Sequence, residues 1–208
     1  MTKPWTAPPL WSVPKVWAGQ RCYILACGES VRQYRDQIPT LTGRVIAIKE
    51  SLLLRPDPDI WFLSGEDCFE NCCDLFPLFT GGEIVARGRS DERFPMTTKR
   101  IGRTTDPAHL SDDPTQVCGF DAGTSAINLA YLFGATEIVL LGYDMVGGRW
   151  ATGLRPHTLP QPPEAQFRTH LGPLPALAAQ LDAKGVKVWN TSPCSRAPFP
   201  YRSLSEVA

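Results

Sequence analysis

Apolar residues in this chain of 208 residues gather in short runs that alternate with amphipathic stretches and turn residues. The clearest run is Glu137–Leu141, in which almost every side chain is apolar. A short continuous apolar run is typical of a parallel strand that is covered on both faces. Similar runs predict five further strands, at Arg21–Ala26, Arg44–Ile48, Asp59–Leu63, Gly82–Ala86 and Val186–Asn190.

Helical spacing appears between these runs. The polar amphipathic stretch Val31–Ile38 predicts a helix, and so does the segment between Ser125 and Gly134. A longer helix is expected over Glu164–Ala183, where leucines recur at helical spacing. Pro173 must kink or delay that helix, because proline cannot donate a backbone hydrogen bond.

The alternation of strands and helices predicts an α/β fold. We expect a single Rossmann-like nucleotide-binding domain over residues 17–208, with a mostly parallel sheet flanked by helices and right-handed connections. The region 87–118 is charged and has little periodicity. It predicts an irregular excursion with one short strand near Thr97–Ile101.

The N-terminal segment, residues 1–16, has a different composition. It holds four prolines and two tryptophans and shows no period, which predicts an extended arm. Its tryptophans are expected to pack onto the domain or a partner. If Trp5 and Trp11 are exposed, they would suit a contact between two copies of the chain and hence a homo-oligomer.

The overall composition fits a protein with a sizeable core and no global charge. Apolar residues make up 43% of the chain, and 21 basic residues balance 21 acidic ones. The absence of a basic field argues against a protein whose main task is to bind nucleic acid backbones. Lys99, Arg100 and Arg103 could still form a local basic pocket.

The seven cysteines show no regular framework. Cys68, Cys72 and Cys73 lie close together, but no CxxC pair or nearby histidine completes a zinc set, so structural thiols are favoured over a metal. No secretory signal is visible, and no apolar run approaches the roughly 20 residues of a membrane span. We therefore expect a cytoplasmic protein.

Turn and polar residues follow the predicted strands, where open parallel sheets bind ligands. The residues expected at these carboxyl ends are Gly28, Glu29 and Ser30 after the first strand, Lys49 after the second, Asp67 after the third, and Gly142 and Asp144 after Glu137–Leu141. The carboxylates of Asp67 and Asp144 could contact ribose hydroxyls, a metal ion or an acceptor.

Two glycine-containing turns offer backbone N–H groups to an anion. Ser30 is expected at the N-cap of the helix that follows Gly28, and the same N–H groups would bind phosphate. Gly123, Thr124 and Ser125 form a second turn before a helix and add two hydroxyls. At Gly123 we expect a close backbone approach and a positive φ.

Three stretches resemble a known superfamily. They are GESV at residues 28–31, AGTSAINLAYLFGATEIVLLGYDM at 122–145 and VKVWNTSPCS at 186–195. They are similar to the Rossmann-like superfamily that joins the bacterial sialyltransferases of glycosyltransferase family 42 to the DUF115 proteins. The latter include 6-hydroxymethylpterin diphosphokinases and many phage proteins. The resemblance implies the fold and a nucleotide or nucleotide-sugar ligand.

The chain departs from the pattern of this superfamily at several positions. Glu29 stands where proline is usual, and Lys49 matches an asparagine that contacts the nucleotide. The sialyltransferases place tyrosines after the Gly-x-Asp turn to hold the leaving phosphate. Val146, two glycines and Arg149 follow here instead, so Arg149 is the residue expected to meet that charge.

The histidines are the candidate general bases. The resemblance places His170 near the start of the C-terminal helix, where the sialyltransferases carry their catalytic histidine. His157, in a loop rich in glycine and proline, is the alternative, and a surface position without a function remains open for both. His109 lies in a polar turn and is expected to be solvated. A histidine of ordinary pKa suits the deprotonation of an acceptor hydroxyl.

Three functions follow from this reading. The first is a glycosyltransferase-like enzyme that moves a sugar from a nucleotide to an unknown hydroxyl acceptor and requires no metal. The second is a Mg²⁺-dependent diphosphokinase of the pterin type, with Asp67, Asp144 or Glu29 holding the ion. The third is a non-catalytic nucleotide-binding phage protein.

Overall fold

A single parallel sheet organises the chain. The structure, a computed structural model, describes residues 9–65, 68–88, 94–95, 97–146, 154 and 164–208. Within these residues eight strands form one sheet in the order β6-β5-β4-β3-β2-β1-β7-β8, and every neighbouring pair is parallel. The strands are β1 Arg21–Leu25, β2 Arg44–Ile48, β3 Ile60–Ser64, β4 Glu83–Arg87, β5 Lys99–Arg103, β6 Gln116–Val117, β7 Glu137–Leu141 and β8 Lys187–Asn190.

The order of the strands places a switch point between β1 and β7. From β1 the chain adds strands in one direction as far as β6, and it then returns to place β7 on the other side of β1. Leu25 lies level with Leu141 in this pair, so the two strands end together. Parallel sheets bind ligands at such switch points, outside the carboxyl ends of the strands.

The two faces of the sheet are covered differently. One core joins alternate strand residues to α2 and α4, and two further cores on the opposite side contain residues of the 3₁₀ helices and α1. The α-helices are α1 Cys68–Cys72, α2 Ala122–Phe133, α3 Glu164–Leu171, α4 Leu174–Ala183 and α5 Leu204–Val207. The 3₁₀ helices are η1 Glu29–Tyr34, η2 Ile38–Thr40, η3 Lys49–Leu54 and η4 Cys73–Leu78. No helix in the described part of the chain has the length and apolar character needed to cross a membrane.

The apolar runs predicted the central strands correctly. Strands β2 and β7 have the predicted bounds, and β1, β3, β4 and β8 differ from the prediction by one residue at one or both ends. The prediction of an irregular segment with one short strand over 87–118 was wrong in part. It contributes both β5 and β6, and these two strands extend the sheet. The short strand expected near Thr97 begins at Lys99.

Two helix predictions need correction. The stretch Val31–Ile38 does not form an α-helix, because the 3₁₀ helix η1 begins at Glu29 with Gly28 in the capping position. The helix expected over Glu164–Ala183 is divided into α3 and α4. Proline at 173 cannot donate the backbone bond that would continue α3, so His170 lies near the end of α3 and does not open a long helix.

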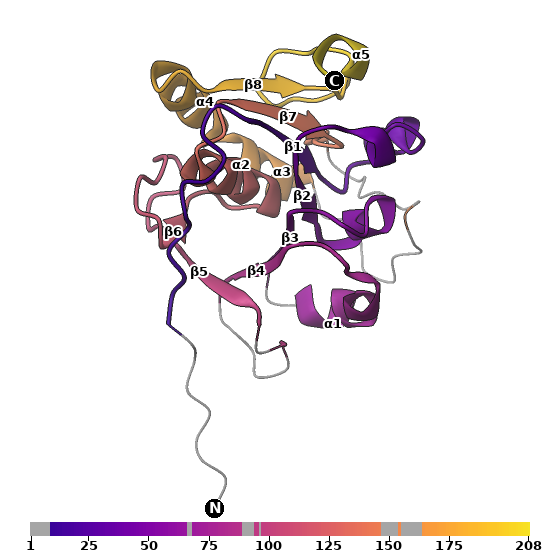
Figure 1. Cartoon of the computed structure of the whole chain (residues 1–208). Coiled ribbons are helices and arrows are strands. Elements are labelled where there is room, and N and C mark those ends of the chain that lie inside the picture. The colour runs from indigo at the N-terminus through magenta and orange to yellow at the C-terminus, as the bar shows by residue number, and fades with distance from the viewer. Residues whose placement is uncertain (1–8, 66–67, 89–93, 96, 147–153, 155–163) are drawn as a thin grey trace, which may run out of the picture.

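The arm packs against the domain over its described part. The backbone N–H of Trp11 donates to the Arg100 carbonyl at 2.7 Å, and the Trp17 ring stacks on Phe133 with a centroid distance of 3.9 Å. Trp11 is half-buried and also contacts Phe133, so it is not the exposed residue that a contact between two copies would use. The arm passes β5 and β6 before it reaches β1 (Figure 1). Trp5 lies outside the described residues.

Candidate functional site

Two glycines bring the turns after β1 and β7 into direct contact. The N–H of Gly28 donates to the carbonyl of Gly142 at 2.8 Å. A Cβ on Gly28 would lie 2.2 Å from that carbonyl oxygen, and Gly142 has a φ of +73° with the Val31 Cβ 2.8 Å from where its own Cβ would be. Both positions therefore require glycine to close the switch point, whatever ligand binds there.

The carboxylate of Asp144 occupies the turn at Ser30. The backbone N–H of Ser30 donates to one carboxylate oxygen at 3.0 Å, and its hydroxyl donates to the other. Asp144 is buried. The donors that the sequence predicts for a phosphate are thus engaged by a carboxylate of the protein, and Ser30 links β1 to β7 instead of capping a helix.

Gly123, Thr124 and Ser125 form the first turn of α2 instead of a turn before it. Asp121 caps this helix, because its carboxylate accepts from the Thr124 N–H at 3.0 Å and from the Thr124 hydroxyl. The Thr124 hydroxyl also lies 2.9 Å from the Tyr143 hydroxyl. A Cβ on Gly123 would lie 2.2 Å from the Tyr143 ring, which explains the glycine there. The expected positive φ at Gly123 was wrong, since the residue is helical.

Arg87, the last residue of β4, contacts the first turn of α2. We call the region formed by Arg87, Asp121 and this first turn the corner. The Arg87 guanidinium donates to the Gly119 carbonyl at 2.8 Å, to the Phe120 carbonyl at 3.1 Å and to the Ser125 hydroxyl. Burial, together with the charge of Arg103, lowers the pKa of Arg87 to about 10. The guanidinium remains protonated at neutral pH, so α2 begins beside a fixed positive charge.

Arg103 and His170 complete the corner. Arg103 ends β5, and its guanidinium lies 5.3 Å from the centre of the Phe120 ring. Burial lowers the pKa of His170, Asp121 raises it, and the charges of Arg87 and Arg103 lower it. The imidazole is therefore neutral at neutral pH and can accept a proton.

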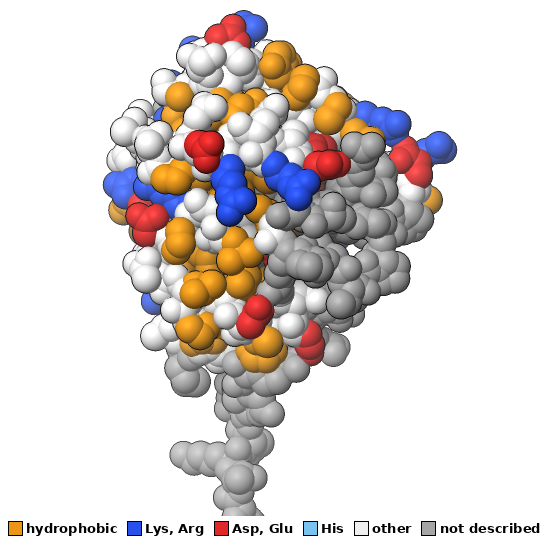
Figure 2. All heavy atoms as spheres, turned by 90° about the vertical axis from the view of Figure 1, so that its right-hand side faces the viewer, with side chains coloured by type: hydrophobic (Ala, Val, Ile, Leu, Met, Phe, Trp, Pro, Cys, Tyr) orange, Lys and Arg blue, Asp and Glu red, His pale blue; other side chains and the backbone are white. Residues whose placement is uncertain are grey.

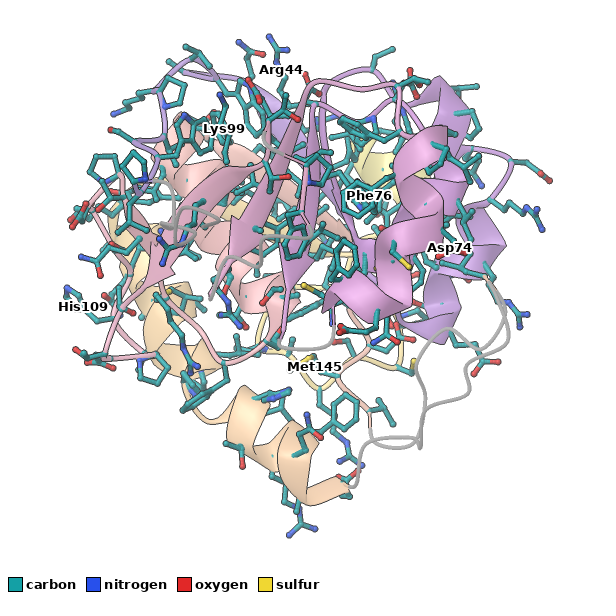
Figure 3. The ribbon with its side chains drawn as sticks, turned by 90° about the horizontal axis from the view of Figure 1, so that it is seen from below. Arg44, Asp74, Phe76, Lys99, His109 and Met145 are labelled. Atoms are coloured by element: carbon teal, nitrogen blue, oxygen red, sulfur yellow. The ribbon has the colours of Figure 1, made fainter. Side chains whose placement is uncertain are left out.

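The backbone of Lys49 adopts a positive φ of 48°, which is unusual for a residue with a side chain. Its carbonyl accepts a hydrogen bond from the Trp61 indole at 2.9 Å. Among the described residues only Met145, after β7, is another non-glycine with positive φ. Such conformations concentrate at functional sites. The two residues follow strands on either side of β1, and Met145 lies toward α3 in Figure 3.

The other predicted residues lie away from this corner or outside the described structure. Asp67, Arg149 and His157 fall outside the described residues. His109 is exposed and lies at the edge of the molecule (Figure 3). No group of three or more histidine, cysteine or acidic residues that could hold a metal occurs in the part that the structure describes. All seven cysteines are free.

The side of the molecule toward which the strands point carries both charged and apolar side chains. Figure 2 shows lysine and arginine side chains across its middle and hydrophobic side chains gathered below them. Phe69, Phe76 and Phe94 contact one another in the region of α1 and η4. The described part of this face therefore carries both polar and apolar side chains.

The fold is shared with solved glycosyltransferase structures. No protein-family model and no curated protein matches the sequence. The Maf glycosyltransferase of Magnetospirillum magneticum AMB-1 superposes over 96% of this chain with a TM-score of 0.63 and 16% identity. The match spans only 36% of that longer protein.

Sialyltransferase structures show the same fold over most of their length. The sialyltransferase CST-II in complex with a trisaccharide acceptor and CMP matches with a TM-score of 0.54 and 15% identity, over 87% of this chain and 85% of that one. CstII of Campylobacter jejuni with the substrate analogue CMP-3FNeuAc has the same TM-score and identity, over 88% and 84% of the two chains. At these identities the likeness establishes a common Rossmann-like fold.

Proposed function

We propose that this chain is a glycosyltransferase-like enzyme that binds a nucleotide sugar at the carboxyl ends of the sheet and transfers the sugar to a hydroxyl acceptor. The observation that carries the proposal is His170, a half-buried imidazole near the end of α3 on which the charges of Arg87 and Arg103 both act. The shared fold with glycosyltransferases supports the same reading.

The chemistry needs a base and a positive environment for the leaving group. His170 takes the proton of the acceptor hydroxyl as its oxygen bonds to the anomeric carbon. The bond from that carbon to the phosphate oxygen breaks, and the electron pair leaves with the nucleotide. Lys49, the N-terminus of α2 and Arg149 are the groups proposed to stabilise the departing phosphate. His157 is the alternative base.

Most of the remaining proposed nucleotide contacts lie in the turns after β1 and β7, at the switch point. Gly28 and Gly142 have no side chains, so the backbone is accessible where a nucleotide would lie across β1 and β7. Asp144 and Asp67 are proposed to accept hydrogen bonds from ribose hydroxyls. Because the Asp144 carboxylate already binds Ser30, a ribose would share this carboxylate and would not displace it.

The test is a thermal-shift screen of CMP, UDP, GDP, ATP and their sugar derivatives, each with and without Mg²⁺. A nucleotide at a hundredfold excess over its dissociation constant stabilises the fold by about 2.7 kcal/mol, so a true ligand is visible. Compounds that bind are then assayed for release of free nucleotide. We expect binding and turnover of a nucleotide sugar without metal.

Other outcomes assign the chain differently. Binding of ATP that requires Mg²⁺, followed by diphosphate transfer, would replace the proposal with the diphosphokinase. Tight nucleotide binding with no turnover of any donor would make the chain a non-catalytic nucleotide-binding protein. If no nucleotide shifts the unfolding temperature, the proposal fails.

A further inference from the structure

Among the described residues, positive charge exceeds negative charge at the start of α2. Arg87 comes from β4, Arg103 from β5, and both act electrostatically on His170 of α3. Among the described residues, Asp121 is the carboxylate whose charge acts on both Arg87 and His170. Its two oxygens already accept from the backbone and hydroxyl of Thr124, so this carboxylate is committed to capping the helix.

Arg87 lacks a carboxylate partner within the described part of the chain. Within the described residues, each hydrogen bond that its guanidinium donates goes to a neutral oxygen, on Gly119, Phe120 or Ser125. A largely buried cation that donates only to neutral oxygens is costly for a fold. The three bonds also fix the plane of the guanidinium, which prepares its remaining donors for a flat oxyanion.

The corner is open to solvent on the side of Arg103. Arg103 is exposed, and the Phe120 ring beneath it is 36% exposed. The side chain of Arg103 and the Phe120 ring are therefore in contact with solvent, whereas the Arg87 guanidinium beside them is half-buried. The N-terminus of α2 adds its partial positive charge to the same place.

We infer that Arg87 and Arg103 form an oxyanion-binding subsite, which holds a carboxylate or phosphate group of a substrate beside His170. This inference deepens the proposed function, because it assigns an anionic group to the substrate that His170 acts on. Arg87 provides the rigid half of the subsite and Arg103 the half that closes on the ligand. Sugar or acceptor molecules without such a group would leave the two cations unpaired.

The subsite can be tested without knowing the substrate. The probes are inorganic phosphate and acetate, titrated separately at constant ionic strength with chloride as the balancing ion. The readout is the pKa of His170, followed by NMR of its imidazole protons and assigned with the His170→Asn variant. An anion bound between the arginines offsets the charges that lower this pKa, so we expect the pKa of His170 to rise with saturation.

Arg103→Gln is the decisive variant, because its side chain is exposed and its loss is compatible with folding. We expect it to weaken anion binding about tenfold or more, as loss of a charged hydrogen-bond donor does, and to raise the pKa of His170 without any anion. Lys99→Gln is the matched control. Lys99 lies on the same strand and is labelled in Figure 3, but its ammonium faces Glu83 at 3.9 Å.

The two probes separate the two chemistries. A response to phosphate alone assigns the subsite to a phosphate, and a response to acetate at similar concentrations assigns it to a carboxylate. The inference is overturned if neither anion moves the pKa of His170, or if Arg103→Gln responds to the anions as the wild type and the Lys99→Gln control do. Because no nucleotide is involved, this result is independent of whether a sugar donor is found.

Discussion

The turns at the switch point and the corner at the start of α2 lie along the same edge of the sheet, yet their electrostatics are opposite. At the switch point Asp144 binds both donors of Ser30, and the glycines at 28 and 142 interlock. At the corner, Asp121 is the carboxylate among the described residues whose charge acts on Arg87, and it is already engaged by Thr124. The Ser30 donors of the first region are bonded within the protein, whereas among the described residues of the second region two arginines outnumber one carboxylate.

The difference distinguishes residues that the backbone turns require from residues that could bind a ligand. Glycines and hydroxyls are needed wherever strands end and turns approach closely, so they occur whether or not a ligand binds. A half-buried cation with neutral partners is harder to explain by folding alone. The corner is therefore the more informative place to look for the substrate, and the switch point the more sensitive place for stability.

The largest expected effect is on stability at the switch point. Gly28→Ala places a Cβ 2.2 Å from the Gly142 carbonyl oxygen, and backbone atoms cannot move aside cheaply. We expect a loss of about 3 kcal/mol or more in the free energy of unfolding, measured in urea. Gly172→Ala is the control, because its nearest neighbour would lie 3.6 Å away and its φ is not positive. Equal losses of unfolding free energy in the two variants would refute the close contact between Gly28 and the Gly142 carbonyl.

The second effect is catalytic and belongs to the corner. His170→Asn should lower turnover of a confirmed donor about a hundredfold or more, with little change in donor affinity, because a positioned base acts mainly in the transition state. His109→Asn is the matched control, since His109 is exposed at the edge of the molecule. Unchanged turnover in His170→Asn would transfer the role to His157 or to a carboxylate.

The sequence predicted the sheet well and the corner poorly, for physical reasons. Buried parallel strands must be apolar on both faces, so β2 and β7 are visible as runs. The same logic placed Gly142 and Asp144 at a strand end. The binding partner of Asp144 is Ser30, 114 residues away in the chain, and no local pattern encodes such a contact.

Arg87 shows what the sequence could have revealed. It ends a predicted strand region, and the rule that selected Lys49 and Asp67 applies to it equally. It stands directly after the predicted strand Gly82–Ala86, but it is also the first residue of the segment 87–118, whose low periodicity predicts irregular structure. The capping role of Asp121 was visible in principle, since aspartate directly before an apolar helical segment is a favoured helix start.

A third prediction compares two residues of the first turn of α2. Gly123→Val should weaken nucleotide binding and reduce stability by about 2 kcal/mol, because its side chain would overlap the Tyr143 ring. Ser125→Ala should weaken binding less and cost about 1 kcal/mol, since it removes the hydroxyl that links Arg87 to the Cys118 carbonyl. Urea unfolding and nucleotide titration measure both. If Ser125→Ala is the more damaging variant, the ring contact is not the main constraint.

The smallest effect is the dependence of stability on the protonation of His170. Burial and the two arginines lower the pKa of this histidine in the folded state, below the value of about 6.5 of an unperturbed histidine. Between these two pKa values the unfolded chain binds more protons, so stability falls as the pH is lowered through that window and is unaffected above it. His170→Asn should flatten this part of the curve of unfolding free energy against pH. Arg103→Gln should flatten it partly, because one of the charges that lower the pKa is removed. A wild-type curve that already shows no slope below about pH 6.5 would mean that His170 is not held neutral by its surroundings.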